Sequence, residues 1–154
     1  MVGVPITRAG YDRLSEELKR LQKKELPEVI KAIEVAREFG DISENAEYHA
    51  AKEKQGLIRA KMNDLQVKLG EAKVMDPPPP NGRVIFGAQV TLYDVDEDKE
   101  LSYRIVGPYE SEPEKGDISS ASPLGQALLT KEEGDEVKIR TPNGLRTLEI
   151  VEIK

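Results

Sequence analysis

At 154 residues, the chain has room for one ordinary domain or two small ones. Charged residues make up 34% of it and aromatic residues only 5%, which excludes one large aromatic-filled core and suits an elongated molecule with much solvated helix surface. A net charge of −6 makes the chain a poor candidate for gripping duplex DNA through its phosphates, so we expect any contact with nucleic acid to be local.

The sequence carries no sign of an oxidising compartment or of a membrane. It contains no cysteine, which excludes disulfides and cysteine-based metal sites. Its first residues lack the basic start, apolar core and small-residue cleavage site of a signal peptide, and no apolar stretch approaches the length of a membrane span. We therefore expect a cytoplasmic protein that does not contact a membrane.

A first long helix is predicted to begin after Thr7, which precedes a run of helical period and is a suitable N-cap. Pro27 lies where the apolar spacing stretches to five residues, which predicts a kink or short break near residues 25–27. The pattern stops at Phe39 and Gly40, where glycine is typical of the position just past a helix end. The predicted apolar seam consists of Leu14, Leu18, Leu21, Leu26, Ile30 and Ile33.

A second helix is predicted to begin at Asp41, with an apolar seam in heptad rhythm. Two helices with matching seams and a very short connection fold back as an antiparallel hairpin. Because this hairpin uses its seam internally, we expect a monomer when free rather than a dimerising coiled coil. The second seam consists of Ile58, Met62, Leu65, Leu69 and Ala72.

A proline-rich segment at residues 76–82 predicts a stiff linker between a coiled-coil hairpin, residues 1–75, and a second domain, residues 83–154. Alternating apolar and polar residues in the second domain predict strands, and Ser122 with Pro123 predicts the start of a short helix that runs through Leu129. The fold class is therefore α+β. The predicted strands cover residues 88–95, 101–106, 136–141 and 145–153, the last two joined by a hairpin turn at 142–144.

The hairpin tip, residues 40–45, carries two carboxylates, Asp41 and Glu44. One interpretation is structural, because Asp-x-x-Glu at a helix start forms a capping box that satisfies free backbone N–H groups. The other is chemical, because two carboxylates are half of a magnesium site. They would bind the ion weakly alone, but beside a partner that already holds one metal they could secure a second, roughly 4 Å away, for phosphoryl chemistry.

The tip and several segments of the second domain together resemble one known family. The tip reads GDISENAEYHAAKE at 40–53, and the second domain contains NGRVIFGA at 81–88, YRIVG at 103–107, ISS at 118–120, SPLGQALL at 122–129 and KEEGD at 131–135. This set, which covers nearly the whole chain, resembles the Gre transcript cleavage factors of bacterial RNA polymerase, of the GreA type.

The resemblance implies a function that is not that of an enzyme in itself. Such a factor inserts its coiled coil into the polymerase secondary channel, and Asp41 and Glu44 help the polymerase hold a second Mg²⁺ and position water. The polymerase then hydrolyses its own backtracked RNA. The resemblance further implies that Arg37 and Lys52 contact the RNA 3′ segment, and that residues 83–154 form an FKBP-like domain that docks on the polymerase.

Several alternatives remain beside this interpretation. A polymerase-binding inhibitor of the same architecture would occupy the channel without promoting hydrolysis, although the intact acid pair favours a cleavage factor. Arg37 and Lys52 could be merely solvated. Tyr48 could stack on a base or seal the hairpin end against Phe39, and we favour sealing. His49 has no second His or Cys nearby in the sequence to support a zinc site.

Overall fold

The computed structural model describes residues 3–41 and 45–154. The chain divides into two compact units, one formed by Asp12–Glu71 and the other by Ala72–Lys154 together with the chain up to Tyr11. The expected boundary lay at residue 75, whereas this division places the first strand with the C-terminal unit. The reason is a short parallel pairing between β1, Val4–Ile6, and β2, Ala72–Val74. Ala72, predicted as the end of a helical seam, therefore begins a strand.

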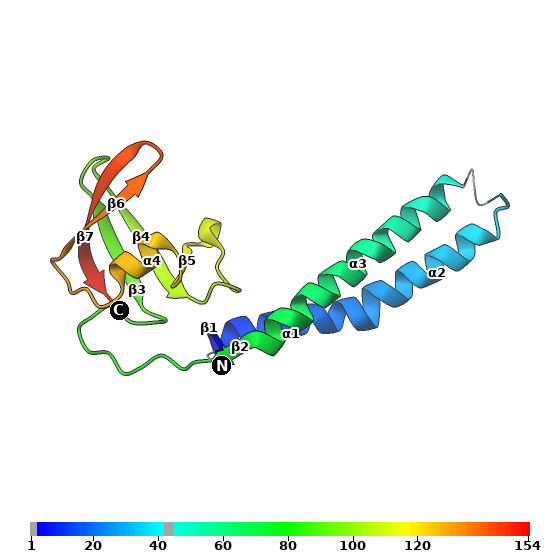
Figure 1. The fold of residues 1–154 in the computed structure, drawn as a ribbon, viewed down its shortest axis with the longest axis horizontal. Coiled ribbons are helices and arrows are strands. Elements are labelled where there is room, and N and C mark those ends of the chain that lie inside the picture. The colour runs from blue at the N-terminus through cyan, green and yellow to red at the C-terminus, as the bar shows by residue number, and fades with distance from the viewer. Residues whose placement is uncertain (1–2, 42–44) are drawn as a thin grey trace. The chain divides into compact units, whose positions relative to one another are not determined.

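Three helices and one widened turn build the helical hairpin (Figure 1). The helices are α1, Arg8–Arg20; α2, Leu26–Arg37; and α3, Ala46–Glu71, and a π-helical turn at Leu21–Glu25 joins the first two. The predicted N-cap is confirmed, since the Gly10 N–H donates to the Thr7 hydroxyl oxygen at 3.0 Å. The predicted irregularity is also confirmed, as the π-helical turn, directly ahead of Pro27 in α2.

The π-helical turn changes which side chains face α3. It contains one residue more than an α-turn, and the seam after it resumes at Val29 rather than at Ile30, which is 38% exposed. The prediction of Ile30 as a seam residue was therefore wrong. Across the hairpin, the Lys61 ammonium pairs with the Glu17 carboxylate at 2.8 Å. The buried seam residues are Leu14, Leu21, Val29, Ile33, Ala36, Ile58 and Leu65.

A five-stranded sheet with the order β5-β4-β3-β7-β6 forms the centre of the other unit. Its neighbours pair antiparallel except for β4 and β5, which are parallel. Four strands agree with the predicted ones to within two residues, whereas the three-residue β5 was not predicted. The strands are β3, Gln89–Asp94; β4, Lys99–Val106; β5, Asp117–Ser119; β6, Glu136–Thr141; and β7, Gly144–Ile153.

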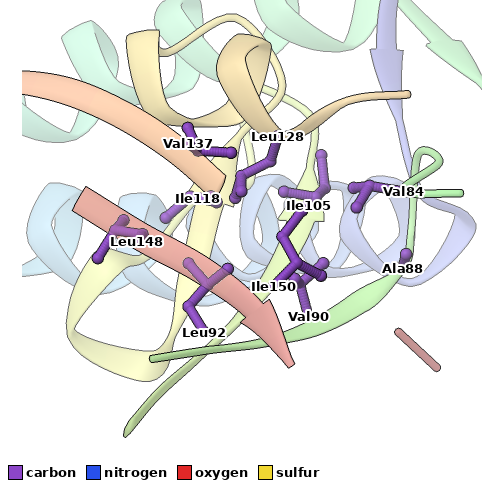
Figure 2. Packing of buried hydrophobic residues seen from close by; sticks show 10 residues of the cluster. All are labelled: Val84, Ala88, Val90, Leu92, Ile105, Ile118, Leu128, Val137, Leu148 and Ile150. Atoms are coloured by element: carbon purple, nitrogen blue, oxygen red, sulfur yellow. The ribbon is translucent and has the colours of Figure 1, made fainter. Parts of the chain in front are cut away.

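One short helix, α4 (Pro123–Leu128), contributes to the core of this unit. Its predicted cap is confirmed, because the Ser122 hydroxyl oxygen accepts the Gly125 N–H at 3.0 Å. Figure 2 shows Leu128 of α4 gathered with apolar side chains of the sheet. The cluster consists of Val84, Ala88, Val90, Leu92, Ile105, Ile118, Leu128, Val137, Leu148 and Ile150. Burial of such apolar surface is the main force that stabilises a domain of this kind.

Within residues 3–41 and 45–154, the structure contains no helix that is both long enough and apolar enough to cross a membrane.

Candidate functional site

The chain leaves α2 at the hairpin tip through a tightening of the last helical turn. The Glu38 N–H donates to the Val35 carbonyl at 3.1 Å and the Phe39 N–H to the Ala36 carbonyl at 3.2 Å. Gly40 follows with φ +109°, a conformation that side-chain-bearing residues rarely adopt. No atom lies within 4 Å of a Cβ built on Gly40, so the backbone conformation rather than crowding requires glycine here.

Asn45, not Asp41, is the N-cap of the second long helix. The Asn45 side-chain carbonyl accepts the Tyr48 N–H at 3.0 Å, and its backbone carbonyl accepts the His49 N–H at 3.1 Å as the first α-helical bond. This is the pattern of an N-cap, and asparagine is among the residues preferred there. The prediction that α3 begins at Asp41, with Asp41 as its N-cap, was therefore wrong. The other residue of the predicted capping box, Glu44, lies outside the described residues.

The Asn45 side chain also reaches the opposite helix. Its amide nitrogen donates to the Ala36 carbonyl at 2.5 Å, while its side-chain oxygen stays on α3. A single side chain thus satisfies an N–H at the start of α3, which lacks a partner within its own helix, and gives the Ala36 carbonyl at the end of α2 a second donor beside the Phe39 N–H. Sequence reasoning missed Asn45, although asparagine just before an unbroken helical run could have indicated it.

Of the two predicted acids, the structure describes only Asp41. Asp41 is exposed and lines a hollow of about 420 Å³ together with Phe39, Asn45, Ala46 and Glu47. Glu44 lies outside the described residues, so its position relative to Asp41 stays a prediction. Asp41 thus offers carboxylate oxygens, the ligand type that Mg²⁺ prefers, from the surface of the tip.

The part of the chain that the structure describes holds no group of three or more His, Cys, Asp or Glu side chains able to bind a metal ion. Any metal that Asp41 binds would therefore need ligands beyond the described residues, because magnesium requires about six oxygen ligands. Waters, substrate and the acids of a partner are the chemically suitable sources.

The two predicted RNA contacts, Arg37 and Lys52, are both exposed. The Arg37 guanidinium carbon lies 5.8 Å from the Tyr48 ring centre, within the range of a cation–π interaction. The Lys52 ammonium donates to the Gln55 side chain at 3.4 Å. Each residue therefore presents positive charge on the hairpin near its tip.

Tyr48 does not take the partner that we expected for it. Phe39 is 71% exposed, whereas Tyr48 lies edge-on to His49, with ring centres 5.5 Å apart, and under Arg37. Phe39 instead remains as a large apolar side chain on the surface of the hollow beside Asp41.

Two family models match nearly the whole length of this chain. The family model described as "Transcription elongation factor, N-terminal" matches residues 4–74, and the one described as "Transcription elongation factor, GreA/GreB, C-term" matches residues 79–154. The chain belongs to the GreA/GreB family of transcription elongation factors. The two matched segments leave out only residues 75–78 in between, within or next to the proline-rich linker.

Individual relatives match this GreA/GreB family member over nearly the whole length of both sequences. Transcription elongation factor GreA of Syntrophobacter fumaroxidans is 52% identical over 155 residues, covering 100% of this chain and 99% of the relative. GreA of Desulfotalea psychrophila is 53% identical over 152 residues, covering 98% and 94%. Among solved structures, GreA factor homolog 1 of Thermus thermophilus is 33% identical and covers 99% of both chains, with a TM-score of 0.45.

Proposed function

We propose that this elongation factor stimulates transcript cleavage by bacterial RNA polymerase. The helical hairpin enters the secondary channel, and its tip acids reach the polymerase active site, where the polymerase hydrolyses its own backtracked RNA. The factor supplies ligands rather than a complete catalytic site. The observation that supports this most directly is an exposed carboxylate, Asp41, at the tip of a long helical hairpin in a chain of the GreA/GreB family.

The chemistry assigned to the tip follows from its oxygen ligands. Bound jointly by Asp41, Glu44 and the polymerase acids, a second Mg²⁺ would stabilise charge on the attacking and leaving oxygens. Asp41 contributes negative charge from an exposed position, and Asn45 rather than Asp41 caps α3. Glu44 contributes a second carboxylate from three residues further along the chain. Together they would hold the ion and orient a water molecule toward the RNA phosphate.

The remaining roles divide between the two parts of the chain. Arg37 and Lys52 are exposed cations on the hairpin, suited to bind the phosphates of the extruded RNA 3′ segment. Residues 83–154 carry the surface that docks on the polymerase. The factor acts as a monomer when free.

The proposal is tested with a halted, backtracked polymerase complex in Mg²⁺, to which the factor is added and in which the RNA products are sized. We expect shortened RNA that the polymerase then extends. The factor with naked RNA serves as the control and should give no cleavage, since its tip acids cannot complete a magnesium site alone. Binding to the complex without cleavage would instead identify an inhibitor that only blocks the channel, and would overturn the proposal.

A further inference from the structure

Asn45 connects the two helix ends that flank the tip. Its amide group donates to the Ala36 carbonyl on α2, and its side-chain oxygen accepts the Tyr48 N–H on α3. Ala36 is itself held firmly, since it is 2% exposed and lies in the seam of the hairpin. The bridge is therefore built on a fixed point of the packed helices rather than on a loose loop.

The chemistry of the bridge is specific to asparagine. An amide carries both donors and an acceptor on one rigid plane, whereas an ionised aspartate of the same shape only accepts. Serine can cap a helix as well as asparagine can, but its hydroxyl ends closer to the backbone. A cap alone therefore does not require asparagine, whereas a cap combined with a reach to the other helix does.

The bridge joins the two helix ends that lie on either side of Asp41. Residues 37–44 lie between its two attachment points, Ala36 and Asn45, and Asp41 lines the same hollow as Asn45. Joining the two helix ends limits how far they can separate, and this restricts where the chain can present Asp41. Such a restriction matters for a metal ligand, because a displacement of 1 Å at a reacting centre can cost about a hundredfold in rate.

We propose that Asn45 is a positioning residue for transcript cleavage: by joining α2 to α3 it fixes where the chain presents Asp41 to the polymerase metal. The inference rests on the proposed function. In this role Asn45 contacts neither metal nor water nor RNA. The role differs from helix capping because it depends on the Asn45 amide N–H that donates to the Ala36 carbonyl, and not on the oxygen that caps α3.

The test compares Asn45→Ser, which keeps a cap but loses the bridge, with Asn63→Ser, which makes the same change on the exposed part of α3 away from the tip. Cleavage by a backtracked complex is measured across factor concentrations, which separates the maximal rate from the half-saturating concentration. We expect Asn45→Ser to lower the maximal rate about ten- to a hundredfold and leave the half-saturating concentration within about twofold. Asn63→Ser should match the wild type in both.

A further variant, Asn45→Asp, separates the donor from the cap. It keeps the shape and the capping oxygen, yet sets a carboxylate against the Ala36 carbonyl, so it should lose maximal rate as Asn45→Ser does. In the free wild-type protein, the Asn45 side-chain amide protons should exchange with solvent at least about tenfold more slowly than those of Asn63. Circular dichroism should show that both Asn45 variants keep the helix content of the wild type.

The outcomes distinguish this inference from the function on which it rests. A wild-type factor that stimulates cleavage, beside an Asn45→Ser factor with the same maximal rate, overturns the role of Asn45 and leaves the proposed function intact. A change confined to the half-saturating concentration overturns it as well, since it would indicate docking. Fast exchange of the Asn45 amide contradicts the bridge without reference to activity. A wild-type factor that gives no cleavage contradicts the proposed function itself.

Discussion

The Glu110 carboxylate holds Thr7. It accepts the Thr7 backbone N–H at 2.7 Å and the Thr7 hydroxyl, and the Gly107 N–H also donates to it at 3.0 Å. Glu110 is only 5% exposed, and a Cβ on Gly10 would lie 2.3 Å from its oxygen, so glycine there makes room for it. Because Thr7 caps α1, the carboxylate fixes both the N-terminal strand and the first turn of that helix.

Replacing Glu110 should loosen the N-terminal strand. Glu110→Ala leaves the Thr7 and Gly107 N–H groups without their charged acceptor, and hydrogen bonds to charged groups contribute about 2 kcal/mol each. We expect amide exchange at Thr7 to accelerate roughly thirtyfold, which corresponds to the loss of the one hydrogen bond that its N–H donates. Glu114→Ala, a change of the same kind at an exposed glutamate, should leave exchange unaltered. Unchanged exchange in Glu110→Ala would show that the carboxylate does not hold the strand.

Arg146 should matter strongly for the stability of the sheet unit. It forms an ion pair with Asp94, which is 0% exposed and also accepts the N–H groups of Asp96 at 3.0 Å and Glu97 at 3.1 Å. Arg146→Ala leaves a buried carboxylate without its cation, a change that costs about 3 kcal/mol in the free energy of unfolding. Urea unfolding should show this loss, whereas Arg140→Ala on the exposed part of β6 should stay within about 0.5 kcal/mol.

The double variant Asp94→Asn with Arg146→Ala provides the control for charge. It removes both members of the pair and should recover part of the lost stability, because no unpaired charge then remains buried. Equal stability of Arg146→Ala and Arg140→Ala would contradict the importance of the pair.

Two glycines in α3 should be replaceable with a gain in stability. Gly56 and Gly70 have no atom within 4 Å of a built Cβ, and glycine within a helix costs about 0.5–1 kcal/mol relative to alanine. Gly56→Ala and Gly70→Ala should each raise the thermal midpoint of the helical signal. Gly107→Ala is the opposite case, because its Cβ would lie 1.9 Å from the Pro5 carbonyl oxygen. A lowered midpoint in Gly56→Ala would contradict the open space around this position.

Local patterns predicted most elements of this fold because those elements are long or have clear caps. The Thr7 cap, the irregularity ahead of Pro27 and the Ser122 cap rest on interactions between near neighbours in sequence, and the four predicted strands are long enough to show alternation. The three-residue strands β1, β2 and β5 are too short to show alternation. Each forms only because a partner distant in sequence lies beside it, which a single segment cannot reveal.

The candidate site could be predicted in composition but not in local geometry. Residue types and the family resemblance indicated Asp41 and Glu44, together with the exposed cations near them. They did not indicate which residue begins α3, because Asp41 and Asn45 are equally suitable N-caps by propensity. The choice depends on the reach of Asn45 to the Ala36 carbonyl, which is a property of the closed hairpin.

Removing the charge of Asp41 tests the central claim most directly, and the measurement is the single-turnover cleavage rate of a backtracked polymerase complex at ordinary Mg²⁺. Asp41→Asn is nearly isosteric and leaves the Asn45 cap of α3 in place, so it should not unfold the tip. If Asp41 binds the second Mg²⁺, the cleavage rate should fall at least about a hundredfold and be partly restored by excess Mg²⁺. Glu44→Gln should lower the rate by a similar factor. Glu47→Gln, which changes another acid of the same hollow, should cleave as the wild type does. Cleavage at the wild-type rate by Asp41→Asn would contradict the account.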